Sequence, residues 1–555
     1  MNDFLQLKKS NCKDCYKCIR NCPVKSISFS EHQAHIVPDE CILCGMCFVS
    51  CPQNAKQIRN DVGLVKELMK AGKPVYASVA PSFVANYDGI SMDAMERALH
   101  KLGFAGASET AVGATIVKKE YEKMLQADKN RVLISSCCHS INMLIQKYYP
   151  EALPYLAQIL SPMQAHCQAI KAENPNAAVV FIGPCISKKD EAEKYPGYAD
   201  VVLTFEELSE WLAEENIAFE EMLDSHTRAR ARLFPTAGGI IRSMDLDPEI
   251  DYIAIDGVEQ CMAALEDILD GKMQNCFVEM SACKGSCVGG PVMSREHNMP
   301  VRDFMAVNRF AGRQDFDVIM PEKIQKSMQY AAMKKQMPGS AAIAEILKKM
   351  GKTAPEHELN CGSCGYNTCR EKAIAVFNGK ADLSMCLPYL KDKAESFSDK
   401  IINNTPNGII VLNEDLEIQQ INKAACEILN VTQASDVLNS PIIRLTDPTD
   451  YFLAVSNQEN VNSKEKYLAQ YKKYVEETII YDKEYHIVMS IMKDITSLEN
   501  TRNKKAEQSA QAIEITDKVV EKQMRVVQEI ASLLGETTAE TKIALTKLKE
   551  TLSDE

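Results

Sequence analysis

The sequence lacks the features that would place a protein in a membrane or on a nucleic acid. It has no run of about 18 apolar residues, the length that a membrane-spanning helix needs. It has no excess of basic residues, since the net charge is −13 and the isoelectric point is near 5.4, whereas nucleic-acid-binding proteins usually present a basic face. The first residues contain neither the apolar core of a signal peptide nor a twin arginine. We therefore expect a cytoplasmic protein with no membrane or nucleic-acid partner.

Cysteine, by contrast, is abundant, because the 555 residues include 21 cysteines. Thiols stay reduced in the cytoplasm, so cysteines gathered there bind metal rather than form disulfides. Sixteen of the 21 fall into four sets with metal-ligand spacing. A chain of this length holds roughly three to five domains. We predict the segments 1–60, 61–350, 355–392, 396–497 and 498–555.

The first two sets form a repeat within residues 1–60. Their sequences are Cys12-x2-Cys15-x2-Cys18-x3-Cys22-Pro23 and Cys41-x2-Cys44-x2-Cys47-x3-Cys51-Pro52. This spacing is typical of a module with two [4Fe–4S] clusters, in which the fourth cysteine of each run binds the other cluster. We predict cluster I on Cys12, Cys15, Cys18 and Cys51, and cluster II on Cys41, Cys44, Cys47 and Cys22. A disulfide framework and zinc ribbons are the alternatives, and the full repetition of the spacing argues against both.

Residues 61–350 alternate short apolar strands with amphipathic helices. We predict strands at Val75–Val79, Val132–Ser135, Val179–Ile182 and Val201–Thr204, and helices at Asp93–Leu102 and Glu206–Glu215. Such βαβ alternation predicts parallel sheets with helices on both faces. Ligands in these folds bind beyond the carboxyl ends of the strands. Cys137 and Cys138 follow one predicted strand and Cys185 follows another, as this rule expects.

Three cysteine motifs of this middle region belong together. They are Ser135-Ser136-Cys137-Cys138, Gly183-Pro184-Cys185-Ile186-Ser187-Lys188-Lys189-Asp190-Glu191 and Glu279-Met280-Ser281-Ala282-Cys283-Lys284-Gly285-Ser286-Cys287-Val288-Gly289-Gly290-Pro291. Their spacing offers a four-thiolate iron–sulfur site assembled from three loops, and a chance scatter of buried cysteines would rarely follow strand ends beside glycine and proline. The isolated cysteines fit a structural role instead, and these are Cys167, Cys261, Cys276 and Cys426.

Over about residues 1–350 the chain resembles the large subunit of the [FeFe]-hydrogenases, because the three motifs occur in that family's order. The resemblance implies an H-cluster, which is a [4Fe–4S] cube joined through one cysteine sulfur to a diiron site with CO, cyanide and a bridging dithiolate amine. It assigns to the cube Cys138, Cys185, Cys283 and Cys287, with Cys287 as the bridge. It gives Lys188 a hydrogen bond to a cyanide, which suits a buried cationic donor. It makes Cys137 the thiol that relays protons.

The chain departs from the catalytic members of that family around the diiron site. Their Pro-Gly-Trp after the double cysteine is His139-Ser140-Ile141 here, and two methionines are replaced by Gly183 and Ser281. The relay serine aligns with Ala157, and the two relay glutamates fall near Tyr121 and Met124, with Glu120 and Glu122 close by. A proton relay needs groups within hydrogen-bond reach, so we expect slow turnover with H2 binding retained. His139 is either a substitute proton donor or a histidine packed beside the cluster.

The fourth cysteine set lies in residues 355–392 and reads Cys361-x2-Cys364-Gly365-x3-Cys369-x16-Cys386. It resembles the small four-cysteine [4Fe–4S] domain of corrinoid iron–sulfur proteins and of some hydrogenase-like sensors. A zinc site is the alternative. The glycine in the first loop favours iron, because backbone N–H groups there can donate to cluster sulfurs.

Residues 396–497 resemble a PAS domain. The matching features are the segment from Asn407 to Asp415, the helix that begins at Asn422, and the closing Asp494-Ile495-Thr496. We expect strands at Gly408–Leu412 and Glu417–Ile421 and a helix at Asn422–Leu429. His486 is the candidate for a heme ligand, and a packed or surface histidine is the alternative. Residues 498–555 are charged and apolar at helical period, which predicts a helical or coiled-coil segment or else a long helix packed on its own domain.

The expected fold is therefore a multidomain α/β and α+β protein, with a ferredoxin-like module, an H-cluster domain, a small four-cysteine domain, a PAS domain and a C-terminal helical segment. The resemblance implies a sensory [FeFe]-hydrogenase that slowly oxidises H2 or reduces protons and relays its redox state to the PAS domain. A ferredoxin-linked metabolic hydrogenase and a non-enzymatic iron–sulfur scaffold are the alternatives. The expected partners are H2 and protons, a redox protein such as ferredoxin, a separate kinase or phosphatase, and a second copy of the chain bound through the PAS domain and C-terminal helices.

Overall fold

The computed structural model describes residues 4–8, 11–128, 131–293, 300–333 and 336–551. The chain divides into two compact units, Met1–Leu390 and Lys391–Glu555.

The N-terminal cysteine repeat also folds as a repeat. Its strands form two antiparallel pairs, β1 (Leu5–Leu7) with β4 (Lys56–Ile58) and β2 (Ile27–Ser30) with β3 (Gln33–Ile36). Each cysteine run contains one helical turn, α1 (Lys17–Arg20) or α2 (Met46–Val49). The residue before each turn has a left-handed backbone, with φ of 53° at Tyr16 and 74° at Gly45. The two halves of the repeat therefore share a backbone conformation as well as a cysteine spacing.

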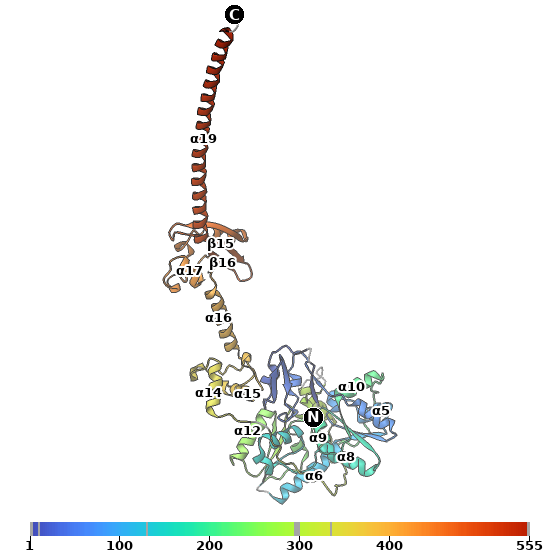
Figure 1. The fold of residues 1–555 in the computed structure, drawn as a ribbon. Helices are drawn as coiled ribbons and strands as arrows, with labels where there is room; N and C mark the ends of the chain where they lie inside the picture. Colours follow the sequence, from blue (N-terminus) through green and yellow to red (C-terminus); the bar gives the residue numbers. More distant parts are fainter. Residues whose placement is uncertain (1–3, 9–10, 129–130, 294–299, 334–335, 552–555) are drawn as a thin grey trace. The chain divides into compact units, whose positions relative to one another are not determined.

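Two parallel sheets lie at the centre of the first unit (Figure 1). One sheet has the order β6-β5-β8-β9, with β5 Val75–Val79, β6 Gly106–Glu109, β8 Ala178–Gly183 and β9 Val201–Thr204. The other has the order β10-β11-β7, with β7 Val132–Ile134, β10 Asp251–Asp256 and β11 Cys276–Ser281. The prediction of parallel strands at four places is confirmed, with each bound correct to within one residue.

Helices connect and cover these strands. They are α3 Val62–Lys70, α4 Phe83–Asn86, α5 Met92–Leu102, α6 Ala111–Ala127, α7 His139–Tyr148, α8 Pro162–Glu173, α9 Ser187–Lys194, α10 Phe205–Glu214, α11 Gly239–Ser243, α12 Val258–Leu269 and α13 Pro300–Phe310. Local sequence sets several of their starts, because α8 and α10 each begin with a capping box. The two predicted helices correspond to α5 and α10.

The topology brings the three central cysteine motifs to one place. Cys138 follows β7, Cys185 follows β8 and Cys283 follows β11. All three strands belong to parallel sheets, and β7 and β11 are direct neighbours. The motifs therefore occupy the carboxyl ends of the strands, where open α/β sheets bind ligands.

The N-terminal module packs closely against the loop that follows the third motif. A Cβ atom added at Gly45 would lie 2.4 Å from the Cβ of Pro291, so this contact admits no side chain. The left-handed backbone at Gly45 also favours glycine. Glycine is thus required twice over at the junction between the N-terminal module and the parallel sheets.

The fourth cysteine set completes the first unit. Its helices are α14 (Ser340–Lys349) and α15 (Cys369–Phe377), and α16 (Leu387–Asn404) begins directly after its last cysteine. A Cβ added at Gly365, where φ is +93°, would lie 2.9 Å from Ile19 in α1. The Lys25 ammonium donates to the Gly365 carbonyl at 3.0 Å. The fourth set therefore packs directly on the N-terminal module.

The second unit contains a five-stranded antiparallel sheet with the order β13-β12-β16-β15-β14. Its elements are β12 Gly408–Asn413, β13 Ile418–Ile421, α17 Lys423–Ile428, α18 Thr449–Asn457, β14 Val461–Leu468, β15 Lys473–Asp482, β16 Ile487–Asp494 and α19 Thr496–Thr551. The expected strands and helix are found, and Asn422 caps α17 through its side chain. The tail is one continuous helix, α19 (Figure 1), and from residue 500 on its side chains are exposed wherever the structure describes them.

Two further observations concern the whole described chain. All 21 cysteines lie in described segments and are free thiols. Within those segments, none of the helices combines the length and the apolar character that crossing a bilayer requires.

Candidate functional site

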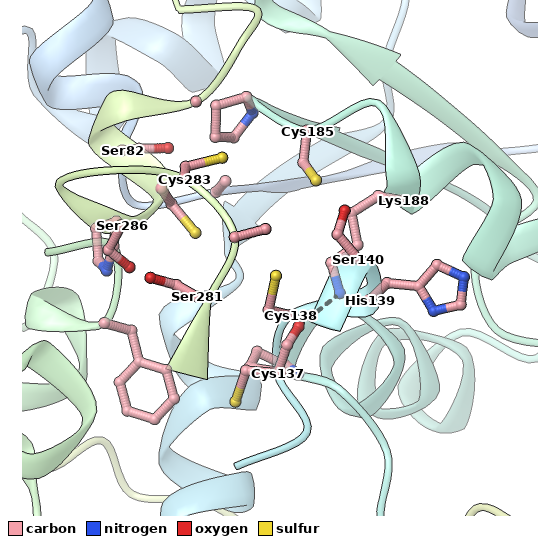
Figure 2. A pocket seen from close by; sticks show the side chains of 18 of the residues that line it. Ser82, Cys137, Cys138, His139, Ser140, Cys185, Lys188, Ser281, Cys283 and Ser286 are labelled. Atoms are coloured by element: carbon pink, nitrogen blue, oxygen red, sulfur yellow. Dashed lines mark hydrogen bonds between the residues drawn. The ribbon is translucent and has the colours of Figure 1, made fainter. Parts of the chain in front are cut away.

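The loops after β7, β8 and β11 enclose one cavity of about 120 Å³. Its wall includes all four cysteines expected to hold the cube, Cys138, Cys185, Cys283 and Cys287. Figure 2 shows the side chains of Cys138, Cys185 and Cys283 pointing toward one another across this space. The Cys137 sulfur points away from these three, although the residue also lines the cavity (Figure 2).

These thiols are poorly suited to remain without a metal. Burial raises the pKa of Cys138, Cys283 and Cys287, and the neighbouring sulfurs raise it further because thiolates in one cavity repel one another. Cys287 is exposed as a residue and also lines the cavity. Metal ligation requires the deprotonated thiolates, so a cationic iron core in the cavity would remove the repulsion.

Two polar groups in the same wall fit a ligand that accepts hydrogen bonds. The Ser82 hydroxyl is fully buried and has no hydrogen-bond partner in the described structure. Such a group in a native protein usually indicates a missing water, ion or ligand. Lys188 also lines the cavity and supplies a cationic N–H. The residues present therefore fit an iron–sulfur group that carries hydrogen-bond acceptors.

A buried ion-pair network holds the Lys188 ammonium. It donates to the Cys137 carbonyl at 3.0 Å and to the Glu191 carboxylate. Glu191 is fully buried and also accepts from Lys326 at 2.8 Å and from the Ser161 hydroxyl at 3.2 Å. Burial alone would lower the pKa of Lys188, but the Glu191 carboxylate outweighs burial and raises it. Lys188 therefore stays protonated as the donor that the resemblance expects.

Glu191 is equally dependent on its two lysines. Burial alone would raise the pKa of its carboxyl group, but Lys188 and Lys326 outweigh burial and hold the pKa well below its usual value. Neither Glu191 nor Lys326 was identified from the sequence. Glu191 lies three residues after Lys188 in the same motif, and that i, i+3 spacing was the available signal.

The predicted proton-relay thiol has an unexpected neighbour. The Tyr121 hydroxyl lies 3.3 Å from the Cys137 sulfur and accepts from the Ser136 N–H at 2.8 Å. The resemblance puts a relay glutamate near Tyr121, and the side chain beside Cys137 is this tyrosine. Burial raises the pKa of Cys137 to about 12 and the pKa of Tyr121 well above its usual value. Both groups therefore hold their protons tightly at neutral pH.

Glu279 is the cavity carboxylate that sequence reasoning missed. It lies on β11, lines the cavity and accepts from the Ile241 N–H at 3.1 Å. Burial raises its pKa to about 7, although backbone N–H groups at the start of α11 oppose that rise. Glu279 is close enough to influence the ionisation of Cys137. Glu279 is the first residue of the third motif, but a single glutamate in an apolar strand does not by itself indicate a functional role.

Of the other expected relay positions, Glu120 and Glu122 do not line the cavity, whereas His139 does. Glu122 accepts from the Asp245 N–H at 2.8 Å, and Glu120 lies 3.6 Å from the Lys123 ammonium. The His139 ring points away from the cysteine sulfurs, and its Nε2 lies 2.8 Å from Asp190 (Figure 2). Of the two readings of His139, the structure favours the packed histidine.

In each N-terminal cysteine run, the fourth cysteine lies with the first three cysteines of the other run, which agrees with the predicted ligand sets. Cys12, Cys15 and Cys18 line one pocket together with Cys51 from the second run. Cys22 lies close enough to Cys41, Cys44 and Cys47 to raise the pKa of each, after burial as the larger cause. Cys44 also lines the central cavity beside Cys283. Cluster II would therefore be the neighbour of the cube.

The fourth set likewise converges on one pocket. Cys361, Cys364, Cys369 and Cys386 line it together with Tyr366 and Lys372. Cys361 is exposed, and hydrogen bonds from Ser363 lower the pKa of its thiol. Among the described residues, no three cysteine, histidine or carboxylate side chains converge tightly enough for a single metal ion. A [4Fe–4S] cube binds each thiolate at a different iron, so its cysteine sulfurs lie farther apart than the ligands of a single ion.

The remaining candidates lie away from these sites. Cys167, Cys261 and Cys276 are buried in α8, α12 and β11, and Cys426 is half-buried in α17. The His486 side chain is 68% exposed and pairs with Glu414 at 3.0 Å. A heme ligand is held inside an apolar pocket, so the structure favours a surface role for His486.

Family models match four segments of this chain. Residues 73–247 and 242–291 match the C-terminal domain of the iron-only hydrogenase large subunit, and residues 11–55 match a 4Fe-4S dicluster domain. Residues 358–388 match an Fe-S cluster model, and residues 397–493 match the PAS fold. The class that fold and site define is therefore an iron–sulfur protein with a hydrogenase-type domain. More particularly, the chain is an [FeFe]-hydrogenase-like protein that carries a PAS domain.

Individual relatives show the same segments at low identity. The periplasmic [Fe] hydrogenase large subunit of Nitratidesulfovibrio vulgaris is 25% identical over 52% of this chain and 87% of its own length. Iron hydrogenase 1 of Clostridium pasteurianum is 25% identical over 43% of this chain and 53% of its own length. The cytosolic Fe-S cluster assembly factor NAR1 of Saccharomyces cerevisiae is 24% identical over 36% of this chain and 47% of its own length. A variant of [FeFe]-hydrogenase HydA1 from Chlamydomonas reinhardtii aligns with a TM-score of 0.40 at 17% identity, over 47% of this chain and 95% of that chain.

Proposed function

We propose that this protein is a sensory [FeFe]-hydrogenase, which binds H2 in the central cavity, oxidises it slowly and passes the electrons through [4Fe–4S] clusters toward the PAS domain. One observation carries the proposal. A single cavity wall combines four converging cysteines with Cys137, Lys188 and the cluster II residue Cys44. The same wall would thus supply cofactor ligands, a proton carrier, a cationic donor and an electron exit.

The residues divide the work by position. When bound, the diiron group would supply the iron at which H2 is separated into two protons and two electrons. Cys138, Cys185, Cys283 and Cys287 would hold the cube. The Lys188 ammonium and the Ser82 hydroxyl would donate to polar ligands of the diiron group, and Lys188 is held in place by Glu191.

Slow turnover follows from the groups around Cys137. A proton carrier works best when its pKa is near the working pH. The Cys137 thiol has a pKa of about 12 because it is buried, and its neighbour Tyr121 is shifted in the same direction. Glu279, with a pKa of about 7, is better matched and lies on the cavity wall. We therefore assign proton release to Glu279 rather than to a Tyr121 route.

Anaerobic infrared spectroscopy tests the proposal. The iron-reconstituted protein would be loaded with a synthetic diiron cofactor and exposed to H2. We expect CO and cyanide bands that shift under H2, with a turnover far below that of catalytic hydrogenases. If no such bands form and electron resonance shows only [4Fe–4S] signals, the hydrogenase function is wrong. A specific activity equal to that of catalytic hydrogenases would instead support a metabolic enzyme.

A non-enzymatic iron–sulfur scaffold is the second candidate. The similarity to a protein named an Fe-S cluster assembly factor favours it, together with the replaced methionines at Gly183 and Ser281. Lys188→Ala separates the two functions, because a scaffold needs no cyanide donor whereas an H-cluster protein should lose its diiron bands. Lys194→Ala, an exposed lysine of the same helix, is the matched control.

We further propose that signal output passes from the PAS domain through α19 to a separate kinase or phosphatase in the cytoplasm, with ferredoxin as an electron partner. The helix supports a dimer, because Ile513, Val520, Val527 and Leu534 recur every seven residues and are all exposed in the single chain. A truncated chain without residues 396–555 should lose its response to H2 through the partner. A truncated chain that still signals would contradict this relay.

A further inference from the structure

The buried lysines of this protein fall into two groups. Seven lysines are buried in the described chain, and four of these have a carboxylate within ion-pair distance. Those four are Lys118, Lys188, Lys189 and Lys326. The other three, Lys56, Lys352 and Lys372, bind backbone carbonyl groups instead and are called here the carbonyl-bound lysines. Among the described residues, these three form no ion pair with a carboxylate.

The carbonyl-bound lysines share one further property, which is their position beside predicted cluster cysteines. Lys56 donates to the Ala34 carbonyl at 2.6 Å and is 4% exposed. Its charge acts on Cys18 of cluster I and on Cys47 of cluster II. It also lines the pocket that holds the cysteines predicted for cluster I.

The other two carbonyl-bound lysines lie in the fourth cysteine set. Lys372 is 1% exposed, donates to the Asp382 carbonyl and acts on Cys364 and Cys386. Lys352 donates to the His357 carbonyl at 2.8 Å and acts on Cys361. Both lysines line the pocket of the fourth cysteine set. The Asp382 carboxylate also acts on Lys372, and it accepts from Ser384.

A buried ammonium group without a counter-charge is strongly unfavourable, because carbonyl dipoles do not replace the lost hydration of a full charge. The missing counter-charge is available in a loaded cluster. Four thiolates outweigh the positive charge of an iron–sulfur core, so each cluster is net anionic, and reduction makes it more so. Net charge and hydrogen bonds set the reduction potential of a cluster. A lysine that attracts the reduced cluster more strongly than the oxidised cluster therefore raises that potential.

We propose that Lys56, Lys352 and Lys372 are the counter-cations of the accessory [4Fe–4S] clusters and raise their reduction potentials, so that these clusters retain the electrons of H2. Each H2 yields two protons and two electrons. The two electrons reduce two of the three accessory clusters by one electron each, and the protons leave to water. Retained electrons suit a sensor, whose output is a lasting redox state, and this inference rests on the proposed cluster sites.

Redox titration followed by electron resonance tests the proposal on the full chain without the diiron group. In Lys56→Met, we expect the ratio of reduced to oxidised N-terminal clusters at a fixed solution potential to fall about tenfold, which is about 59 mV for one electron. The fourth cluster should not change. In Lys372→Met the pattern should reverse, with the fourth cluster affected and the N-terminal clusters unchanged. A chain with Cys361→Ser and Cys386→Ser, which removes the fourth cluster, assigns the signals.

Two controls separate charge from structure. Lys17→Met removes an exposed lysine beside the same cluster, where water screens the charge, so the potentials should stay within about twofold in that ratio. Lys56→Arg keeps the charge and should restore the wild-type potentials, which a packing role alone would not explain. If Lys56→Met takes up no iron, Lys352→Met and Lys372→Met decide the question independently in the fourth set.

The outcomes distinguish this inference from the proposed function. Wild-type protein without any [4Fe–4S] resonance would contradict the cluster sites themselves. Normal resonances with unchanged potentials in the Lys56, Lys352 and Lys372 variants would overturn the role of the lysines alone. Equal shifts in Lys17→Met and Lys56→Met would also overturn it, because an exposed charge would then act as strongly as a buried one.

Discussion

Replacing Glu191 by glutamine should strongly destabilise the hydrogenase-like domain. The substitution preserves shape but removes the carboxylate that serves Lys188 and Lys326 together. Glu191 is 0% exposed, and both lysines are buried beside it. Water cannot reach the two ammonium groups to replace the lost charge, so the variant leaves two buried cations with one neutral amide.

The expected cost follows from the burial. Breaking a buried ion pair by removing one partner costs about 3–5 kcal/mol, because the other charge is left uncompensated. At about 2–4 °C per kcal/mol for a domain of some 150–250 residues, the melting temperature should fall by roughly 6–20 °C. Glu193→Gln, an exposed glutamate of the same helix paired with Arg59, should change stability by at most about 1 kcal/mol.

Tryptophan fluorescence can follow this unfolding, because the chain has a single tryptophan and Trp211 lies buried in α10 of the same unit. The double variant Glu191→Gln with Lys326→Met should recover part of the lost stability, since only Lys188 then remains uncompensated. A melting temperature of Glu191→Gln within about 2 °C of wild type would refute the reasoning, as would a loss equal to that of Glu193→Gln.

Three further predictions follow from other parts of the structure. Gly45→Ala should destabilise the junction of the N-terminal module by about 1–3 kcal/mol more than Gly72→Ala, measured by thermal unfolding, because both have a left-handed backbone but a Cβ meets no atom within 4 Å at Gly72. Burial raises the folded-state pKa of Glu279 from its ordinary value of 4.5 to about 7. The protonated carboxyl group should therefore contribute stability that is complete below pH 4.5 and is lost as the pH rises through 7. Melting curves recorded over this pH range should lose that dependence in Glu279→Gln. Val527→Asp should yield monomers in sedimentation experiments if α19 pairs with a second copy, whereas Lys522→Asp, outside the apolar seam, should not.

The parts of the site that could be predicted from sequence are those in which function demands a fixed local spacing. The turn between Cys12 and Cys18 binds a cluster through a fixed cysteine spacing, so the motif can be recognised from the sequence. The assignment of Cys51 to the cluster of the first run can be predicted in the same way, because the second run repeats the full spacing. The strand ends at Ile134 and Gly183 were predictable to within one residue from short apolar runs, since buried parallel strands have that composition.

The parts that could not be predicted depend on contacts between distant segments. The sequence does not indicate that Lys56 is buried close to Cys18 and Cys47, because a lysine after a cysteine run is ordinarily exposed. Gly365 meets Ile19 across more than three hundred residues, and no periodicity encodes such a contact. Tyr121 is an intermediate case, because the resemblance drew attention to this position but only the structure showed that its hydroxyl lies 3.3 Å from the Cys137 sulfur.

The chain also joins the fourth cysteine set mechanically to the helix that leads toward the PAS domain. The Cys386 carbonyl accepts the Leu390 N–H at 2.9 Å, so a predicted cluster ligand begins α16. The start of a helix carries a partial positive charge, and an anion there stabilises the first turn by about 0.3–1 kcal/mol. Reduction of a cluster on Cys386 would therefore favour the folded first turn of α16 by roughly two- to fivefold, and coupling of this kind is reciprocal. Amide exchange of residues 387–404 should be slower in reduced than in oxidised protein, and equal exchange in both states would contradict this coupling.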